Sequence, residues 1–386
     1  MPGNPSGADA GAAIERKDLD RLLGLLHARG YTVMGPVARE AAIVWAEVSA
    51  ASELPAGWSD EQEAGRYRLH RSAGAALFDW TVGPSSPKCS LHPATVTLFH
   101  ARRAGRDLEL LDGDPPPAKQ AFLGVRACDL AAIALQDRIL LGGQVTDPLY
   151  HARRESALLI AVQCGRAGGT CFCASMGTGP EVRSGHDLVL TEVMEDGRHL
   201  FVAAAGSARG AELLAELGAR AATAAEADAA AAAVTRAACG MGRTLETDGL
   251  PGLLARTLEH PNWEAVARRC LACGNCALVC PTCFCVTTED FTDPAAGRSR
   301  RVRRWDTCFS VDYSYIHGGS VRSSIRARYR QWLTHKLGTW HDQFGSSGCV
   351  GCGRCITWCP AGIDITAEAR ALRRRQRRKE GSRAHA

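Results

Sequence analysis

The sequence predicts two domains: an α/β domain, then a mainly helical domain that carries two matched cysteine quartets. Three observations predict this fold class. The 386 residues are enough for two domains. Short apolar runs alternate with helical patterns up to about residue 255, and little strand pattern follows. Residues 270–281 and 349–360 both have the spacing C-x₂-C-x₂-C-x₃-C-P.

The α/β domain is expected over residues 17–255. Residues 1–16 lack a basic-then-apolar signal pattern and are interpreted as a disordered leader. In residues 17–29 the spacing of four leucines predicts a helix with one apolar side. The runs "AAIVWAEV", "TVTLFHA", "AFLGV" and "ALLIAVQC" predict strands of a mixed sheet. The alanine-rich stretch 205–238 favours a helix with a narrow apolar face.

The second domain is expected over residues 256–372, with a basic tail at 373–386. Pro261 and Asn262 mark the start of a helix that runs into Cys270. "SSIRARYRQWLTHKL" places apolar residues on one helical face, with Ser323 or Ser324 available as cap. A last helix is expected from about residue 365 into the tail. Each quartet therefore lies at the end of a helix.

The spacing of each quartet is typical of a [4Fe–4S] cluster, so two such clusters are predicted. Three thiolates on one tight loop reach three corners of a cubane, and the fourth reaches a neighbouring cluster in two-cluster ferredoxins. Gly274 and Gly353 allow close approach of the backbone, and Pro281 and Pro360 fix the exit from each loop. The predicted ligands are Cys270, Cys273, Cys276 and Cys280, and Cys349, Cys352, Cys355 and Cys359.

Structural zinc is the alternative for these quartets, and disulfides are a second one. Zinc sites usually pair two well-separated C-x₂-C halves, unlike a run of four cysteines. Seventeen cysteines in a secreted chain would suggest disulfides, but most of these cluster and no secretion signal precedes them. We therefore expect a cytoplasmic, metal-binding chain.

Nine further cysteines lie outside the quartets. Cys128, Cys164, Cys171 and Cys173 are enough for a third iron–sulfur cluster if the fold unites them, and small buried thiols are the alternative. Cys283, Cys285 and Cys308 have no assignment, although "TCFC" occurs at both 170–173 and 282–285. Cys89 and Cys239 stand alone.

The charge distribution is uneven. Residues 298–336 hold ten Arg or Lys against Asp306 and Asp312, and the C-terminal tail is also basic. This basic band would offset cluster charge or dock an acidic protein partner. No nucleic-acid motif is present, and no run of about 18 apolar residues, so neither nucleic acid nor a membrane is an expected partner.

Motifs for other cofactors are absent. No G-x-G-x-x-G follows a predicted strand, so no flavin or NAD site is expected in this chain, and no G-x-x-x-x-G-K-[ST] occurs, which argues against nucleotide hydrolysis. No C-x-x-C pair remains outside the quartets to hold a nickel–iron centre.

Several stretches together resemble one family. They are "GVRACDLAAI", "TCFCASMGTGP", "RCLACGNCALVCPTCFC", "RRWDTCF", "SYIHGGSVRSSIRARYRQWLTHKL" and "GCVGCGRCITWCPAGIDI". They are similar to the iron–sulfur beta subunit of cytoplasmic sulfhydrogenases, which are NAD(P)-linked nickel–iron hydrogenases. The electron-carrying iron–sulfur chain of anaerobic sulfite reductase is also similar. The resemblance covers about 120–370 and is most specific from 269 to 360.

The resemblance implies an electron-transfer subunit with a helical dicluster ferredoxin domain and no catalytic residue of its own. It implies three partners: a flavin- and NAD(P)-binding subunit, a small iron–sulfur subunit, and a large nickel–iron subunit. The eight quartet cysteines would be ligands. Seven of the other nine have counterparts in the family with no role assigned, namely Cys128, Cys164, Cys171, Cys173, Cys283, Cys285 and Cys308.

Three functional hypotheses follow from the sequence. The first is the electron-transfer subunit of a hydrogenase, which relays single electrons between a nickel–iron core and a flavin subunit. The second is the same module in a sulfite or polysulfide reductase. The third, a zinc-binding or redox-sensing protein, predicts no stoichiometric sulfide.

Overall fold

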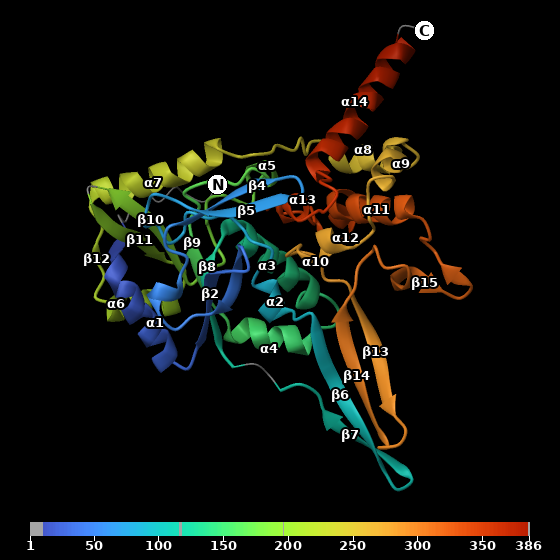
Figure 1. Cartoon of the computed structure of the whole chain (residues 1–386), viewed down its shortest axis with the longest axis horizontal. Helices are drawn as coiled ribbons and strands as arrows, with labels where there is room; N and C mark the ends of the chain where they lie inside the picture. The colour runs from blue at the N-terminus through green and yellow to red at the C-terminus, as the bar shows by residue number, and fades with distance from the viewer. Residues whose placement is uncertain (1–10, 116–117, 196, 385–386) are drawn as a thin grey trace.

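The computed structural model describes residues 11–115, 118–195 and 197–384, and it is shown in Figure 1. A sheet covered by helices lies at one side, and a smaller group of helices that carries both quartets lies at the other. A long β arm projects from between the two parts, and the C-terminal helix projects from the opposite side.

The first part is built on an eight-stranded sheet among the described residues. Its middle strands are parallel, whereas the outer pairs are antiparallel. In spatial order the strands are β12 (Arg220–Ala221), β1 (Ala12–Glu15), β11 (Arg198–Ala205), β10 (Leu188–Glu195), β9 (Leu158–Val162), β8 (Gln120–Val125), β2 (Thr32–Arg39) and β3 (Ala42–Glu47).

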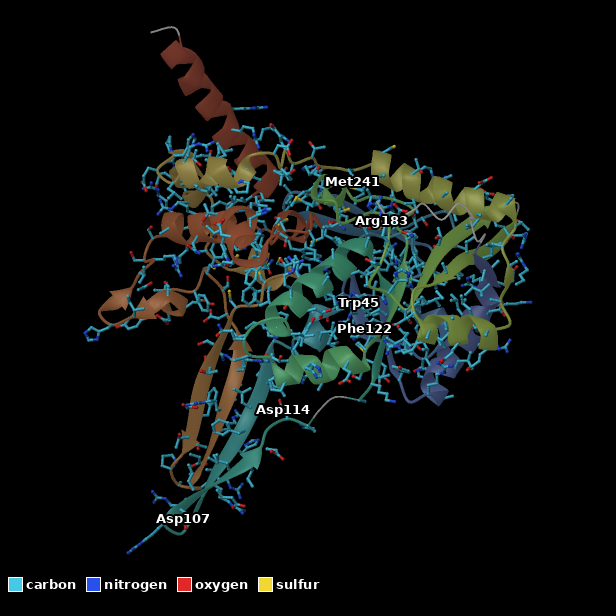
Figure 2. The ribbon with its side chains drawn as sticks, turned by 180° about the vertical axis from the view of Figure 1, so that it is seen from behind. Trp45, Asp107, Asp114, Phe122, Arg183 and Met241 are labelled. Carbon is cyan, nitrogen blue, oxygen red and sulfur yellow. The ribbon has the colours of Figure 1, made fainter. Side chains whose placement is uncertain are left out.

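Helices cover both faces of this sheet. One face packs against α1 (Leu19–Ala28) and α6 (Ala208–Glu216), and the other against α3 (Ala127–Leu140) and α4 (Pro148–Ser156). The four leucines predicted to face inward from α1 (Leu19, Leu22, Leu23, Leu26) are all fully buried. On the second face the rings of Trp45 and Phe122 meet edge-on, 5.9 Å apart (Figure 2). The α/β prediction for this part of the chain is confirmed.

The leader prediction is wrong for residues 12–15. They form strand β1, which pairs with both β11 and β12. Ile14 is buried in the sheet core, so the fold uses this segment although it carries only one large apolar residue. Residues 1–10 of the predicted leader lie outside the described residues.

The alanine-rich stretch forms two helices instead of one. Helix α6 ends before Gly218, and α7 (Ala224–Cys239) begins at a Thr223 cap that receives the N–H of Glu226. The remaining helices of the first part are α2 (Lys88–Leu91) and α5 (Cys173–Met176).

The second part carries both quartets as expected, but the prediction that it is mainly helical is not confirmed. Its helices are α8 (Leu250–Arg256), α9 (Asn262–Ala267), α10 (Asn275–Leu278), α11 (Ile325–Thr334), α12 (Trp340–Phe344), α13 (Arg354–Thr357) and α14 (Ile365–Ala384). The Oγ of Ser324 caps α11 as expected. Helix α14 continues through most of the segment predicted as a basic tail.

Two eight-residue strands interrupt these helices. β13 (Val286–Asp293) and β14 (Arg298–Trp305) form a sheet with β6 (Thr95–Ala104) and β7 (Asp107–Asp112), in the order β13-β14-β6-β7. This sheet is the arm of Figure 1, and Figure 2 shows Asp107 at its tip. The arginine-rich run of β14 hid the strand pattern, because arginine side chains on both faces of an exposed ribbon give no apolar alternation. The arm also joins segments from both predicted domains.

Two short hairpins complete the fold. β4 (Trp58–Glu63) and β5 (Arg66–Arg71) form one, and β15 (Tyr315–Ile316) and β16 (Gly319–Ser320) form the other. The first packs on the second quartet, where the ring of Tyr67 stacks on that of Trp358 at 5.1 Å. No helix among the described residues is long and apolar enough to cross a membrane.

A buried ion pair joins the two parts. Arg354 on α13 donates to both carboxylate oxygens of Asp129 on α3, at 2.7 and 3.1 Å. Both side chains are almost fully buried, at 1% and 2% exposure. Arg354 also donates to the carbonyls of Gly83 and Ser85. Removing one partner of such a pair leaves an uncompensated buried charge.

We expect Asp129→Ala to lower the free energy of unfolding by about 3–5 kcal/mol, because it leaves the buried Arg354 guanidinium without its carboxylate partner. Urea unfolding of anaerobically purified protein, followed by circular dichroism, measures this. Asp290→Ala breaks the exposed Asp290–Arg301 pair on the arm and is the control, with little expected change. Equal losses in both variants would contradict the role given to the buried pair.

Candidate metal centre

The fourth cysteine of each quartet lies with the first three cysteines of the other quartet. Cys270, Cys273, Cys276 and Cys359 line one cavity, which Cys355 also reaches. Burial, followed by the neighbouring thiols of Cys359, Cys270 and Cys273, raises the pKa of Cys276. The fourth cysteine of the second quartet therefore lies with the first three of the other.

The second group has the reciprocal composition. Burial, followed by the thiols of Cys349, Cys352 and Cys280, raises the pKa of Cys355. Cys280 is also among the thiols that raise the pKa values of Cys349 and Cys352. Each group thus combines three cysteines of one quartet with the last cysteine of the other, as in two-cluster ferredoxins.

Local backbone geometry is repeated in the two quartets. In each, the first two cysteines lie on a loop that enters a four-residue helix, α10 or α13, through a left-handed glycine, and the third cysteine lies on that helix. Gly274 has φ +74° and Gly353 has φ +77°. A Cβ on Gly353 would lie 2.5 Å from the carbonyl oxygen of Thr170, so this glycine also permits contact with another chain segment.

Backbone N–H groups point at the sulfur atoms. The N–H of Ala272 donates to Cys270 Sγ and that of Gly351 donates to Cys349 Sγ, both at 3.4 Å. The N–H of Ile363 donates to Cys359 Sγ at 3.3 Å. Such bonds favour thiolate over thiol and influence the reduction potential of an iron–sulfur cluster.

The Sγ of Cys280 accepts a hydrogen bond from a lysine ammonium, whereas the Sγ of Cys359 accepts one from a backbone N–H. Lys336 Nζ lies 3.4 Å from Cys280 Sγ and also donates to Thr282 Oγ1 and the carbonyl of Gly348. Burial favours the neutral amine, but the thiols of Cys280, Cys283 and Cys349 outweigh it and raise the pKa of Lys336. Lys336 lies in a π-helical segment, His335–Thr339, between α11 and α12. π-Helical turns are frequent at functional sites.

The thiol of Cys280 is correspondingly acidic. A hydrogen bond from Cys283, together with the cations of Lys336 and Lys88, lowers its pKa well below the usual value. Lys88 Nζ donates to the carbonyl oxygens of Cys280 and Cys283 at 2.8 and 3.3 Å. Sequence reasoning missed Lys88, which lies in no cysteine motif, and it included Lys336 only as one of the ten basic residues of the band 298–336.

The fold also unites the four cysteines of the first domain. Cys128 and Cys164 follow the carboxyl ends of the adjacent parallel strands β8 and β9, where side chains from neighbouring strands meet. Burial, followed by the thiols of Cys171, Cys164 and Cys352, raises the pKa of Cys173. Cys128 packs in one buried cluster with Cys173 and Cys352.

This first-domain site lies against the second quartet. The N–H of Phe172 donates to the carbonyl of Gly351 at 2.8 Å, and Cys171 Sγ lies 3.9 Å from the carbonyl oxygen of Cys352. Met241, whose sulfur lies 3.9 Å from Cys173 Sγ, is labelled in Figure 2 at the junction of the two parts.

The three unassigned cysteines form another group. Cys283, Cys285 and Cys308 line one cavity with Asp306 and Lys336. A hydrogen bond from Cys308 lowers the pKa of Cys285 to about 6. Cys89 and Cys239 are exposed.

The donors fit iron–sulfur clusters. Each crossed group provides four thiols, sulfur-directed N–H groups and a left-handed glycine at the point of closest approach. Among the described side chains, no three His, Cys, Asp or Glu converge closely enough for one metal ion. Thiolate is the ligand that holds iron–sulfur clusters in proteins.

Two comparisons with known proteins identify relatives. Residues 269–363 match the family model described as a 4Fe-4S dicluster domain. The chain is 32% identical over 257 residues to "Sulfhydrogenase 2 subunit beta" of Pyrococcus furiosus. The aligned region covers 66% of this chain and 73% of that protein. No solved structure matches the chain.

The contact between the second quartet and Thr170 predicts a specific steric defect. Gly353→Ala should lower the melting temperature and the iron content, because its Cβ would meet a backbone oxygen that cannot move aside. Gly345→Ala is the matched control, since Gly345 has φ +70° but no atom within 4 Å of its Cβ position. Both variants carry the left-handed penalty of about 1–2 kcal/mol, so only the clash differs. Equal melting temperatures would contradict the close packing.

Proposed function

This chain belongs to the family of iron–sulfur beta subunits of sulfhydrogenases, and from that premise we propose how its thiol sites carry electrons. The family and the dicluster domain make it an iron–sulfur electron-transfer subunit. Its finer assignments, which are the ligands, the number of clusters and the partners, are our proposal.

The proposed ligand sets are crossed. Cys270, Cys273, Cys276 and Cys359 hold one [4Fe–4S] cluster, and Cys349, Cys352, Cys355 and Cys280 hold the other. The shared cavity of the first set and the mutual pKa effects of the second support this grouping. Bound clusters would supply one-electron oxidation and reduction. The protein holds the thiolates, directs N–H groups at them and excludes water.

We further propose that Cys128, Cys164, Cys171 and Cys173 hold a third cluster. Their convergence beside Cys352 supports this site, because it lies against the loop of the second quartet. The three sites then form a series in which the Cys280-containing set is central. Cys273 is exposed, so the Cys270-containing set lies at the surface end of the series.

The proposed partners are a flavin- and NAD(P)-binding subunit, a small iron–sulfur subunit, and a large nickel–iron subunit. Membership of a multisubunit family supports partner subunits in general. The exposed Cys273 loop, with the 66% exposed Leu271 beside it, is our candidate for one docking point. The chain itself would exchange electrons with these subunits and make or break no covalent bond of a substrate.

Iron and acid-labile sulfide per chain test the number of clusters. We expect at least twelve of each in anaerobically purified protein, and about four fewer in Cys171→Ser, because a lost thiolate removes one cubane. Cys239→Ser, which changes an exposed cysteine, should retain the full content. About eight iron with no effect of Cys171→Ser would leave only the two ferredoxin sites. Stoichiometric zinc without sulfide would refute the electron-transfer function.

The central site is expected to have the higher potential of the two ferredoxin sites, because Lys336 places a buried positive charge beside Cys280. Lys336→Met should lower its midpoint potential by on the order of 50–100 mV, as a nearby unit charge acts through a medium of moderate dielectric constant. Lys336→Arg, which keeps the charge, should shift it less. A redox titration followed by EPR measures both, and an unchanged potential in Lys336→Met would contradict this role.

A further inference from the structure

We propose that Cys283, Cys285 and Cys308 hold an additional iron–sulfur cluster beside the central site, in the cavity that they share with Asp306. This inference rests on the proposed function, because it assumes a chain that is loaded with iron and sulfide. It gives a role to three thiols that the ferredoxin sites and the first-domain site leave unused.

The cavity resembles the one proposed for a ferredoxin cluster. It has a volume of about 20 Å³, against about 30 Å³ for the cavity of the Cys270-containing set. Trp332 lines both cavities, and Trp340 adds a second aromatic wall here. Isolated core cysteines would be dispersed through the interior, whereas these three thiols line one small cavity.

A repeated tetrapeptide supports the site. Thr-Cys-Phe-Cys occurs at 170–173, where it provides two thiols to the first-domain site, and again at 282–285. Both copies pack against the loop of the second quartet. The N–H of Phe172 donates to the carbonyl of Gly351, and Thr282 Oγ1 donates to the carbonyl of Gly348 at 2.6 Å. The same short motif thus contacts one loop at two points and presents cysteines at both.

The base of the arm brings the third thiol into place. Strands β13 and β14 are paired from Val286 with Trp305, and the N–H of Asp306 donates to the carbonyl of Cys285 at 2.9 Å. Cys308 follows two residues later and lines the same cavity as Cys285. Cys285 and Cys308 are therefore positioned by the hairpin, and Cys283 by the segment that leaves the first quartet.

The charges around the cavity suit an anionic group. Lys336 lines it, and Lys88 Nζ donates to the carbonyl of Cys283 and lies 3.8 Å from the Trp305 ring centre. The ammonium of Lys336 beside three thiols would compensate part of the negative charge of a thiolate-ligated cluster. Asp306, whose Oδ1 accepts from the N–H of Thr307, provides a carboxylate at the same cavity for a fourth ligand.

The test compares the iron, sulfide and EPR signals of variants in the full-length, anaerobically purified protein. We expect Cys308→Ser and Cys285→Ser each to lose at least two iron and two sulfide per chain, while the EPR signals of the two ferredoxin sites remain. Cys89→Ser changes an exposed cysteine outside all four groups and should lose none. Unchanged iron in both Cys308→Ser and Cys285→Ser would overturn the inference.

A second variant tests the additional site even if Cys308→Ser misfolds at the arm. Cys171→Ser removes the first-domain site but leaves the arm intact, so it should still hold at least ten iron per chain. Eight iron in that variant would overturn the additional site whether or not Cys308→Ser folds. A disulfide between Cys285 and Cys308 in the as-purified, iron-replete protein, detected by peptide mass spectrometry, would also overturn it. Absence of sulfide from the unmodified protein would instead refute the proposed function.

Discussion

The loop from Gly348 to Gly353 is packed so closely on both sides that its neighbours leave no room for a Cβ at any of its three glycines. A Cβ on Gly351 would lie 2.6 Å from the carbonyl oxygen of Phe172, and one on Gly348 would lie 2.1 Å from the ring of Trp340. Because this loop contacts both copies of the Thr-Cys-Phe-Cys motif, the positions of the surrounding thiols depend on it. The first domain, the second quartet and the base of the arm are all brought together at this one loop.

Buried cations surround the same loop. Arg354 pairs with Asp129 on one side, and Lys336 contacts Cys280 on the other. Burying a positive charge is costly unless anions compensate it, so these side chains are compatible with folding only when thiolates or carboxylates face them. Arg354 is paired by a carboxylate and serves chiefly to join the two parts. Lys336 faces thiols, and this difference makes it the residue with the most direct influence on a bound cluster.

The arm has a different electrostatic character. Several of its arginines are paired with acidic residues of the same sheet or the adjoining body, as in Arg301 with Asp290, Arg304 with Glu289 and Arg303 with Asp147. It also projects away from α10 and α13 (Figure 1). The arginines of the arm therefore do not surround the quartets, whereas Lys336, at the end of the same basic band, contacts Cys280. Its base contributes Cys285 and Cys308 to a cavity, whereas its tip lies far from the body.

The sequence by itself determined the chemistry of the quartets, because three cysteines on a tight loop specify local geometry within a dozen residues. It also predicted α1, the cap of α11 and the α/β character of the first part, since these follow from short-range periodicity and capping. Only the tertiary structure decided which fourth cysteine joins which set, that Cys128 and Cys164 follow adjacent strand ends, and that Lys336 lies beside Cys280. These are contacts between residues distant in the chain, and no local pattern encodes them. Strand β1 and strands β7, β13 and β14 of the arm escaped prediction, and "TVTLFHA" was predicted as a strand of the mixed sheet but forms β6 of the arm. In each case pairing with strands remote in the sequence decides the outcome.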